Sequence, residues 1–202
     1  MAKKASGGLI VLFVILGLAV VCFGAFKSMQ NRLVTLDESV ESAWAQVQNQ
    51  YQRRYDLIPN LVSTVKGYAA HEKEVFEDVA NARASAGGQL VMTSDILNDE
   101  AAFARFQQAQ DELGSSLRRL LAISENYPEL KADQNFLALQ DQLEGTENRI
   151  STERKRYIDA VKDYNIEIRK FPINLFAANM GFEKKATFSA AGEAQSVPKV
   201  EF

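Results

Sequence analysis

Cysteine, histidine and proline are scarce in this chain, and each scarcity excludes a class of protein. Cys22 is the only cysteine among 202 residues, so a scaffold held together by disulfides is excluded. His71 is the only histidine, which leaves histidine-rich metal sites and serine or cysteine triads with at most one candidate base. With only four prolines, long stretches can form helices without interruption.

Basic residues are also fewer than acidic ones. The chain has 23 Lys and Arg against 26 Asp and Glu, a net charge of −3 at pH 7, whereas nucleic acid binding needs a clustered basic face. No Walker-type or GxGxxG loop occurs, and Ala86-Gly87-Gly88 is expected only to end a helix. We therefore expect no nucleic acid partner, no catalytic residue, no cofactor and no metal.

Charged residues are absent from one stretch near the N-terminus. Leu9 to Phe26 are eighteen consecutive uncharged, mostly aliphatic residues, and Gly7 and Gly8 extend the run to 20. At about 1.5 Å per residue, a helix of this length spans the roughly 30 Å hydrocarbon core of a bilayer. The sequence predicts a short basic N-terminus at 1–6, a transmembrane helix at 7–26, and the lipid bilayer as a partner.

Two rival interpretations of this stretch fit the sequence less well. A cleaved signal peptide has an apolar region of about 7 to 15 residues and a small residue three places before the cut, where Phe23 stands. A lipid-modified Cys22 would follow small residues, but Val20 and Val21 precede it. Because short basic N-termini usually stay in the cytoplasm, we expect the body of the protein on the opposite side of the membrane.

Helical periodicity dominates the rest of the chain. A predicted core position recurs every seven residues from Val40 to Ala82, and it is apolar except at Arg54. A second series that starts at Trp44 is interleaved with it and is apolar except at Glu72. Near the C-terminus the seven-residue series is Phe136, Leu143, Ile150, Tyr157, Tyr164 and Phe171. The pattern predicts an all-α protein, in which an N-terminal transmembrane helix precedes an antiparallel up-and-down bundle of about four helices, at residues 27–182. The alternative is a long kinked helical hairpin.

Pro59 interrupts neither series. Either Asp56 caps a new helix with Pro59 in its first turn, or one long helix kinks at Pro59. The sequence alone does not decide between a turn and a kink.

Polar residues occupy several positions of the predicted core. Buried charges need partners, so the plainer interpretation is an internal network of arginine and glutamate that fixes helix register. The functional interpretation is a polar layer that contacts a ligand or a partner protein. Its candidate residues are Arg53, Arg54, Asp56, Glu72, Glu147 and Arg154.

An apolar segment follows the last predicted helix, which ends at Pro172. A chain that leaves the membrane and makes an even number of passes returns toward the membrane near Phe171. The large apolar side chains beyond it could lie in the lipid interface, or could fill the base of the bundle or contact a neighbouring subunit. They are Ile173, Leu175, Phe176, Met180 and Phe182.

Residues 183–202 have the composition of a flexible tail. Its last residues alternate apolar and polar side chains, so Val200 and Phe202 could contact a partner protein by adding to a sheet edge. A tail without a role is the alternative.

Several motifs of this chain resemble those of a known protein family. QRRYDLIPNLV (52–62), VKGYAAHE (65–72), NFLALQDQL (135–143), TENRI (146–150) and the ending PKVEF (198–202) resemble the LemA family of bacterial membrane proteins. The resemblance covers nearly everything after the predicted anchor. It implies a single-pass, N-terminally anchored protein with an antiparallel helical bundle. Together with the basic N-terminus, which we expect in the cytoplasm, this predicts a protein of the inner membrane with its body outside or in the periplasm. The resemblance brings no catalytic motif.

Two hypotheses on function follow. The family includes a branch associated with magnetosomes, which suggests envelope organisation, so the first hypothesis is a non-enzymatic scaffold that forms homo-oligomers on the membrane surface. The second is an adaptor that recruits an envelope enzyme or sensor through the polar layer or the tail.

Overall fold

The computed structural model describes residues 3–90 and 94–189. The first helix, α1 (Lys3–Tyr68), has 66 residues and is roughly 100 Å long at 1.5 Å per residue. The other helices are α2 (Lys73–Leu90), α3 (Glu100–Ala122), the single turn α4 (Pro128–Lys131) and α5 (Gln134–Arg169). Short 3-10 segments join or follow them: η1 (Ser94–Asn98), η2 (Ile123–Asn126), η3 (Ile173–Leu175) and η4 (Ala178–Met180).

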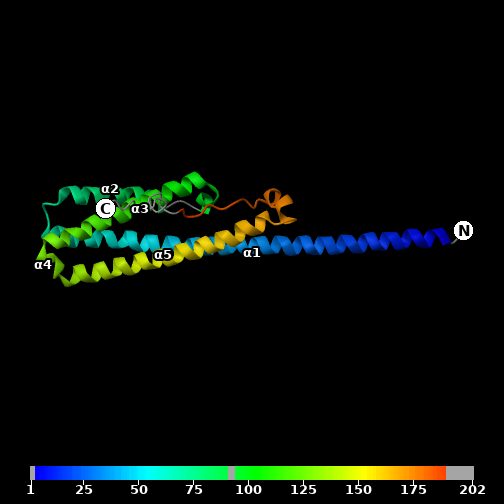
Figure 1. Cartoon of the computed structure of the whole chain (residues 1–202), viewed down its shortest axis with the longest axis horizontal. Helices are drawn as coiled ribbons and strands as arrows, with labels where there is room; N and C mark the ends of the chain where they lie inside the picture. Colours follow the sequence, from blue (N-terminus) through cyan, green and yellow to red (C-terminus); the bar gives the residue numbers. More distant parts are fainter. Residues whose placement is uncertain (1–2, 91–93, 190–202) are drawn as a thin grey trace, which may run out of the picture.

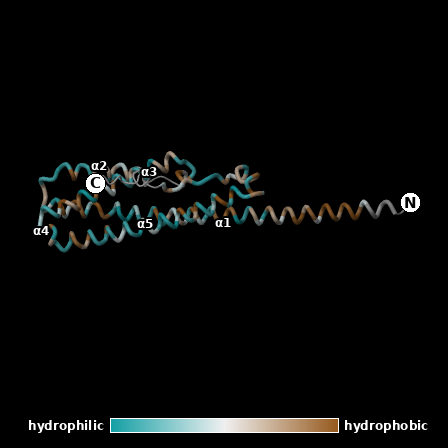
Figure 2. The backbone as a smooth tube through the Cα atoms, viewed as in Figure 1, coloured by the Kyte–Doolittle hydropathy of each residue, from teal (hydrophilic) through white to brown (hydrophobic). Residues whose placement is uncertain are grey.

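The C-terminal part of α1 forms an up-and-down bundle with α2, α3 and α5, and the N-terminal part projects from it alone (Figure 1). The projecting part is the most apolar stretch of the backbone (Figure 2). From Gly8 onward α1 is long and apolar enough to cross a membrane. The predicted fold class, an apolar N-terminal helix followed by an antiparallel bundle, is confirmed.

Pro59 lies inside α1 and does not end it. Its ring is on the exposed side of the helix, whereas Ile58 and Leu61 beside it are buried, at 1% and 2% exposure. Packing of the neighbouring apolar residues therefore offsets the backbone hydrogen bond that proline removes. Of the two alternatives left open by the sequence, the structure excludes the turn, and Asp56 does not cap a helix but accepts a hydrogen bond from Gln52 (2.7 Å) within α1.

The helix ends at one place within the seven-residue series from Val40. The chain turns between Tyr68 and Lys73, at the end of the bundle far from the projecting part of α1. Tyr68 is 41% exposed there, and its hydroxyl donates to Asp133 (3.0 Å), which caps α5 through the Phe136 amide. These two bonds lower the pKa of the Asp133 carboxyl, the backbone bond contributing most. His71 is exposed in this turn and not on a helix face.

The core consists of two hydrophobic clusters. The distal cluster, which includes Ile58, Leu113 and Leu143, is closed by α2. The proximal cluster, nearer the apolar part of α1, is built around Trp44 and Phe103. Because α2 ends at Leu90, η1 and the extended segment 183–189 cover the proximal cluster in its place.

Gly87 and Gly88 lie in the last turn of α2 and do not end it, contrary to the expectation from the sequence. Gly87 is needed for close packing. A Cβ atom there would lie 2.7 Å from the Tyr55 hydroxyl and 3.0 Å from a ring carbon, while the Arg83 guanidinium covers that ring 4.0 Å from its centre. A Cβ on Gly88 would meet nothing within 4 Å.

This contrast gives a matched pair of variants. Gly87→Ala should lower the free energy of unfolding by about 1–2 kcal/mol, because the Tyr55 ring must move. Gly88→Ala should leave it unchanged or raise it by about 0.5 kcal/mol, since alanine is the better helix former. Chemical unfolding followed by circular dichroism measures both, and equal effects of the two substitutions would contradict this packing.

Candidate functional site

A polar layer centred on Arg54 separates the two hydrophobic clusters. Arg54 comes from α1 and is 3% exposed. Its guanidinium donates to Glu147 Oε1 on α5 (2.8 Å), and to the side-chain oxygen (2.6 Å) and main-chain oxygen (3.1 Å) of Gln110 on α3. Gln110 is itself 2% exposed, so the layer joins three helices through the interior. It fixes their register, because sliding one helix would leave a buried charge without its partners.

An open cavity of about 590 Å³ lies beside this layer, between α3 and α5. Three arginines line it, Arg54, Arg118 and Arg154, with the acids Asp111 and Glu147. Gly114 lies beside two of the arginines, and a Cβ there would be in ordinary van der Waals contact with the guanidinium groups of Arg54 (3.6 Å) and Arg118 (3.8 Å). The arginines can present several hydrogen-bond donors to an anionic group.

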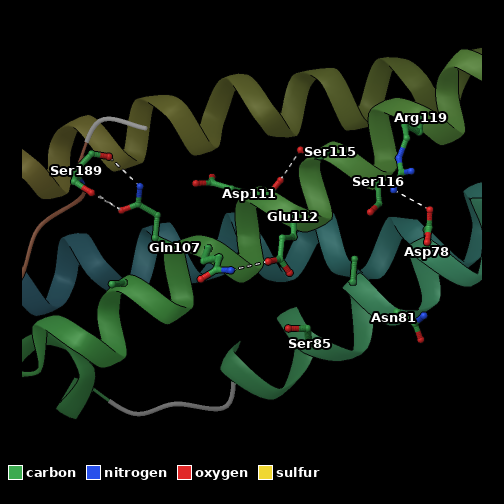
Figure 3. Close-up of a pocket in the computed structure, with 13 residues that line it drawn as sticks. Asp78, Asn81, Ser85, Gln107, Asp111, Glu112, Ser115, Ser116, Arg119 and Ser189 are labelled. Carbon is green, nitrogen blue, oxygen red and sulfur yellow. Dashed lines mark hydrogen bonds and ion pairs between the residues drawn. The ribbon is translucent and has the colours of Figure 1, made fainter. Parts of the chain in front are cut away.

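A second, larger hollow of about 900 Å³ lies on the other side of α3, toward α2 (Figure 3). Gln107, Asp111 and Ser115, spaced four residues apart on α3, line both cavities. Arg119 and Asp78 form an ion pair of 2.8 Å across the far end of this hollow. The smaller cavity has mainly polar walls, which suits contacts with a polar ligand or protein surface, whereas the larger hollow exposes more apolar than polar surface.

Burial and charge act in opposite directions on Tyr51, which also lines the smaller cavity. Burial raises the pKa of its hydroxyl, and the positive charges of Arg154 and Arg54 oppose that rise. Arg54 lies 5.1 Å from the centre of the Tyr51 ring. The tyrosine therefore stays neutral at physiological pH.

The structure brings together only part of the predicted polar layer. Arg54 and Glu147 form its centre, and Arg154 lines the cavity, 3.9 Å from Asp111. Arg53 is exposed on α1 and apart from it. Asp56 is bound to Gln52, and Glu72 accepts a hydrogen bond from Tyr127 (3.1 Å) at the distal turn. The seven-residue spacing put Glu72 in the core because it does not reveal the turn at 69–72.

The apolar segment after α5 divides into two sets. Ile173 is buried in the proximal cluster, and Met180 and Phe182 pack against that cluster. Leu175 and Phe176 are 59% and 43% exposed. The Phe176 ring stands edge-on to Phe26 with centroids 5.8 Å apart, so the chain returns to the end of the apolar run in α1.

The segment 183–189 packs on the bundle, although the sequence placed it in a flexible tail. The Asn165 side chain holds the main chain of Lys185 in both directions, accepting from its nitrogen (3.0 Å) and donating to its oxygen (2.9 Å). The Tyr157 hydroxyl donates to the Ala186 oxygen (2.7 Å). Phe188 enters the aromatic cluster, 4.9 Å from Phe103 between ring centroids.

Sequence reasoning missed Phe188 and Asn165, and one signal could have found Phe188. The residues Lys185 to Phe188 alternate polar and apolar, which is typical of an extended segment with one buried face. Val200 and Phe202, the predicted tail contacts, lie outside the residues that the structure describes.

In the described ranges 3–90 and 94–189, no group of three or more His, Cys, Asp or Glu side chains is placed to hold a metal ion. The arrangement around Arg54 can bind and orient a charged group. No catalytic role is assigned to any of its residues.

Comparison with known proteins finds a matching family and several relatives of the chain. A profile of the LemA family matches residues 43–202. Two proteins of Paramagnetospirillum magneticum, Magnetosome protein MamQ 1 and Magnetosome protein MamQ 2, are each 32% identical over 193 residues, which is 88% of this chain and 71% of each relative. Magnetosome protein MamQ of Magnetospirillum gryphiswaldense is 28% identical over 173 residues, or 78% of this chain and 64% of the relative. The chain belongs to the LemA family.

Proposed function

We propose that this protein is a non-enzymatic, membrane-anchored helical scaffold of the bacterial envelope, whose copies associate side by side on the membrane surface. The observation that supports this most directly is the continuity of α1, in which the apolar N-terminal part and the first bundle helix are one helix. Such a link holds the bundle in a fixed direction relative to the bilayer. Copies anchored in this way present the same faces to one another.

We place residues 7–26 across the inner membrane, with the N-terminus in the cytoplasm and the bundle outside or in the periplasm. Exposed His71 at the distal turn offers a test of this orientation. In a Cys22→Ala background, a thiol introduced by His71→Cys should react with a membrane-impermeant maleimide in spheroplasts before lysis. Reaction only after lysis would reverse the orientation.

Exposed apolar side chains on the bundle offer a surface for association. Val34 on α1, and Ile158 and Ile166 on α5, are 44%, 37% and 44% exposed. They lie on the two helices that pack along each other from the distal end to the membrane-proximal end (Figure 1). We propose that copies meet through this α1 and α5 surface and through the anchors.

Replacing Ile158 and Ile166 by serine should reduce the mass of the assembly in detergent, because the apolar area that drives association is lost. Leu137→Ser is the control, since Leu137 is equally exposed but lies at the far end of α5. Light scattering coupled to size-exclusion chromatography measures the mass. A mass that is unchanged in the Ile158 and Ile166 variant, or a wild-type protein that is monomeric at high concentration, would contradict the proposal.

A second candidate function, an adaptor for an envelope enzyme or sensor, is favoured by the polar cavity between α3 and α5 and by the larger hollow on the other side of α3. The exposed Arg118 at the smaller cavity is the best position for a charge reversal, because its side chain is not needed in the core. Arg118→Glu and deletion of residues 198–202 should each remove a co-purified partner while helicity is retained. A partner that survives both changes would contradict this function.

A further inference from the structure

The membrane-proximal end of the bundle carries a cluster of cations beside exposed apolar side chains. We propose that it is a binding surface for anionic phospholipid headgroups. We name it the basic collar and define it as Lys27, Arg32, Arg169 and Lys170, around the apolar Phe171, Leu175 and Phe176. The proposal rests on the proposed function, in so far as the apolar part of α1 must cross the bilayer.

Charge is segregated at this end of the molecule. Within residues 26–36 and 166–182, the four cations face one acid, Glu167, a surplus of three positive charges. The next acids on the bundle side of these ranges are Asp37, which pairs with Lys185 (3.0 Å), Glu38 and Glu183. None of the four is buried. In the described part of the chain, Lys27 and Arg169 have no carboxylate partner.

Two contacts hold the segment at residues 26–32 beside the segment at residues 167–176. Glu167, whose side chain is 7% exposed, accepts from Arg32 Nε on α1 (2.9 Å) and from Lys170 Nζ beyond α5 (2.8 Å). The ring contact between Phe26 and Phe176 joins the same two segments nearly two turns closer to the N-terminus of α1. Arg32 and Lys170 still have 63% and 53% of their side chains exposed, so Glu167 positions them without covering them.

The apolar members complete a surface suited to lipid. Phe171 is 80% exposed and directly follows Lys170, and Leu175 is exposed on the next turn. Aromatic side chains favour the headgroup level of a bilayer, and each Lys or Arg close to an anionic membrane surface adds to the attraction. The end of the apolar run at Phe26 lies against this surface, so the anchor itself brings the collar to the headgroups.

Contact between the basic collar and the membrane is measured by the rate at which a maleimide reacts with a cysteine placed at position 175. The full chain with Cys22→Ala and Leu175→Cys is reconstituted in vesicles of phosphatidylcholine, with or without phosphatidylglycerol, and reacted with a charged maleimide. A second protein with Cys22→Ala and His71→Cys reports reaction at the distal turn and corrects for orientation in the vesicles. Phosphatidylglycerol should slow the reaction at position 175 about fivefold relative to position 71, and 1 M salt should remove the difference because the Debye length falls to about 3 Å.

Lys27→Gln and Arg169→Gln, added to the protein with Leu175→Cys, should restore the faster reaction in vesicles with phosphatidylglycerol. The fold should be kept, since neither residue forms an ion pair with Glu167. Lys131→Gln with Lys155→Gln makes the same change of charge away from the collar and should leave the slow rate intact. Equal rates in both kinds of vesicle would overturn the proposal while leaving the anchor and the scaffold untouched. Slow reaction at position 175 in both kinds of vesicle, becoming slower as the density of protein in the membrane rises, would also overturn the proposal. It would indicate that a second copy of the chain covers this surface. Failure of the chain to insert would instead contradict the proposed function.

Discussion

Replacing Arg54 by alanine should lower the free energy of unfolding by about 3 kcal/mol. The substitution removes the only cation of the buried layer, and leaves the Gln110 side chain, 2% exposed, without the group that satisfies its oxygen. A buried acceptor without a donor costs about 1–3 kcal/mol, and the space left by the arginine adds to this. Chemical unfolding monitored by circular dichroism measures the change.

Replacing the whole layer should behave differently from removing one member. In the triple variant Arg54→Met, Gln110→Leu and Glu147→Leu, apolar side chains of similar size would join the two hydrophobic clusters, and stability should equal or exceed that of the wild type. A triple variant that is less stable than Arg54→Ala alone would contradict this account of the layer. A stable triple variant that no longer associates or binds a partner would show that the layer is kept for function.

Phe188→Ala should destabilise the protein by a similar amount, about 3 kcal/mol. The ring lies among Trp44, Phe103 and Tyr157, at centroid distances of 6.4, 4.9 and 5.7 Å, and the Arg154 guanidinium covers it at 4.2 Å. Its loss leaves the proximal cluster open on the side that α2 is too short to reach.

The same substitution should release the extended segment from the bundle. Limited proteolysis should then cut within residues 183–189 at rates well above those of the wild type, because segments detached from the core are the preferred sites of cleavage. Thr187→Ala is the control, since Thr187 is exposed beside Phe188. Rapid cleavage of the wild-type segment would contradict its place in the core.

The helical part of the fold could be predicted because burial repeats with the helix period. The apolar residues Val40 and Tyr51 on α1, and Leu143 and Tyr157 on α5, occupy the core as expected. Phe171, the last member of the α5 series, is 80% exposed because α5 ends at Arg169. The same logic identified the pair of Arg54 and Glu147, since the buried Arg54 requires a partner, although the Glu147 side chain is 44% exposed.

The remaining features depend on contacts between distant segments, which spacing does not encode. The seven-residue series passes through the turn at 69–72 without losing phase, so Glu72 was placed in the core. The role of Gly87 follows from the approach of Tyr55 from another helix, and the burial of Phe188 follows from the short length of α2. The collar arises because folding brings Arg169 and Lys170 to the level of Lys27 and Arg32.

Electron microscopy of the intact, anchored protein in lipid nanodiscs and in detergent tests the central claim most directly. A scaffold predicts regular assemblies of several copies, with the bundles side by side and standing on one membrane face. Dispersed single bundles at all protein concentrations would contradict self-association, and would leave the adaptor as the function that the cavities support.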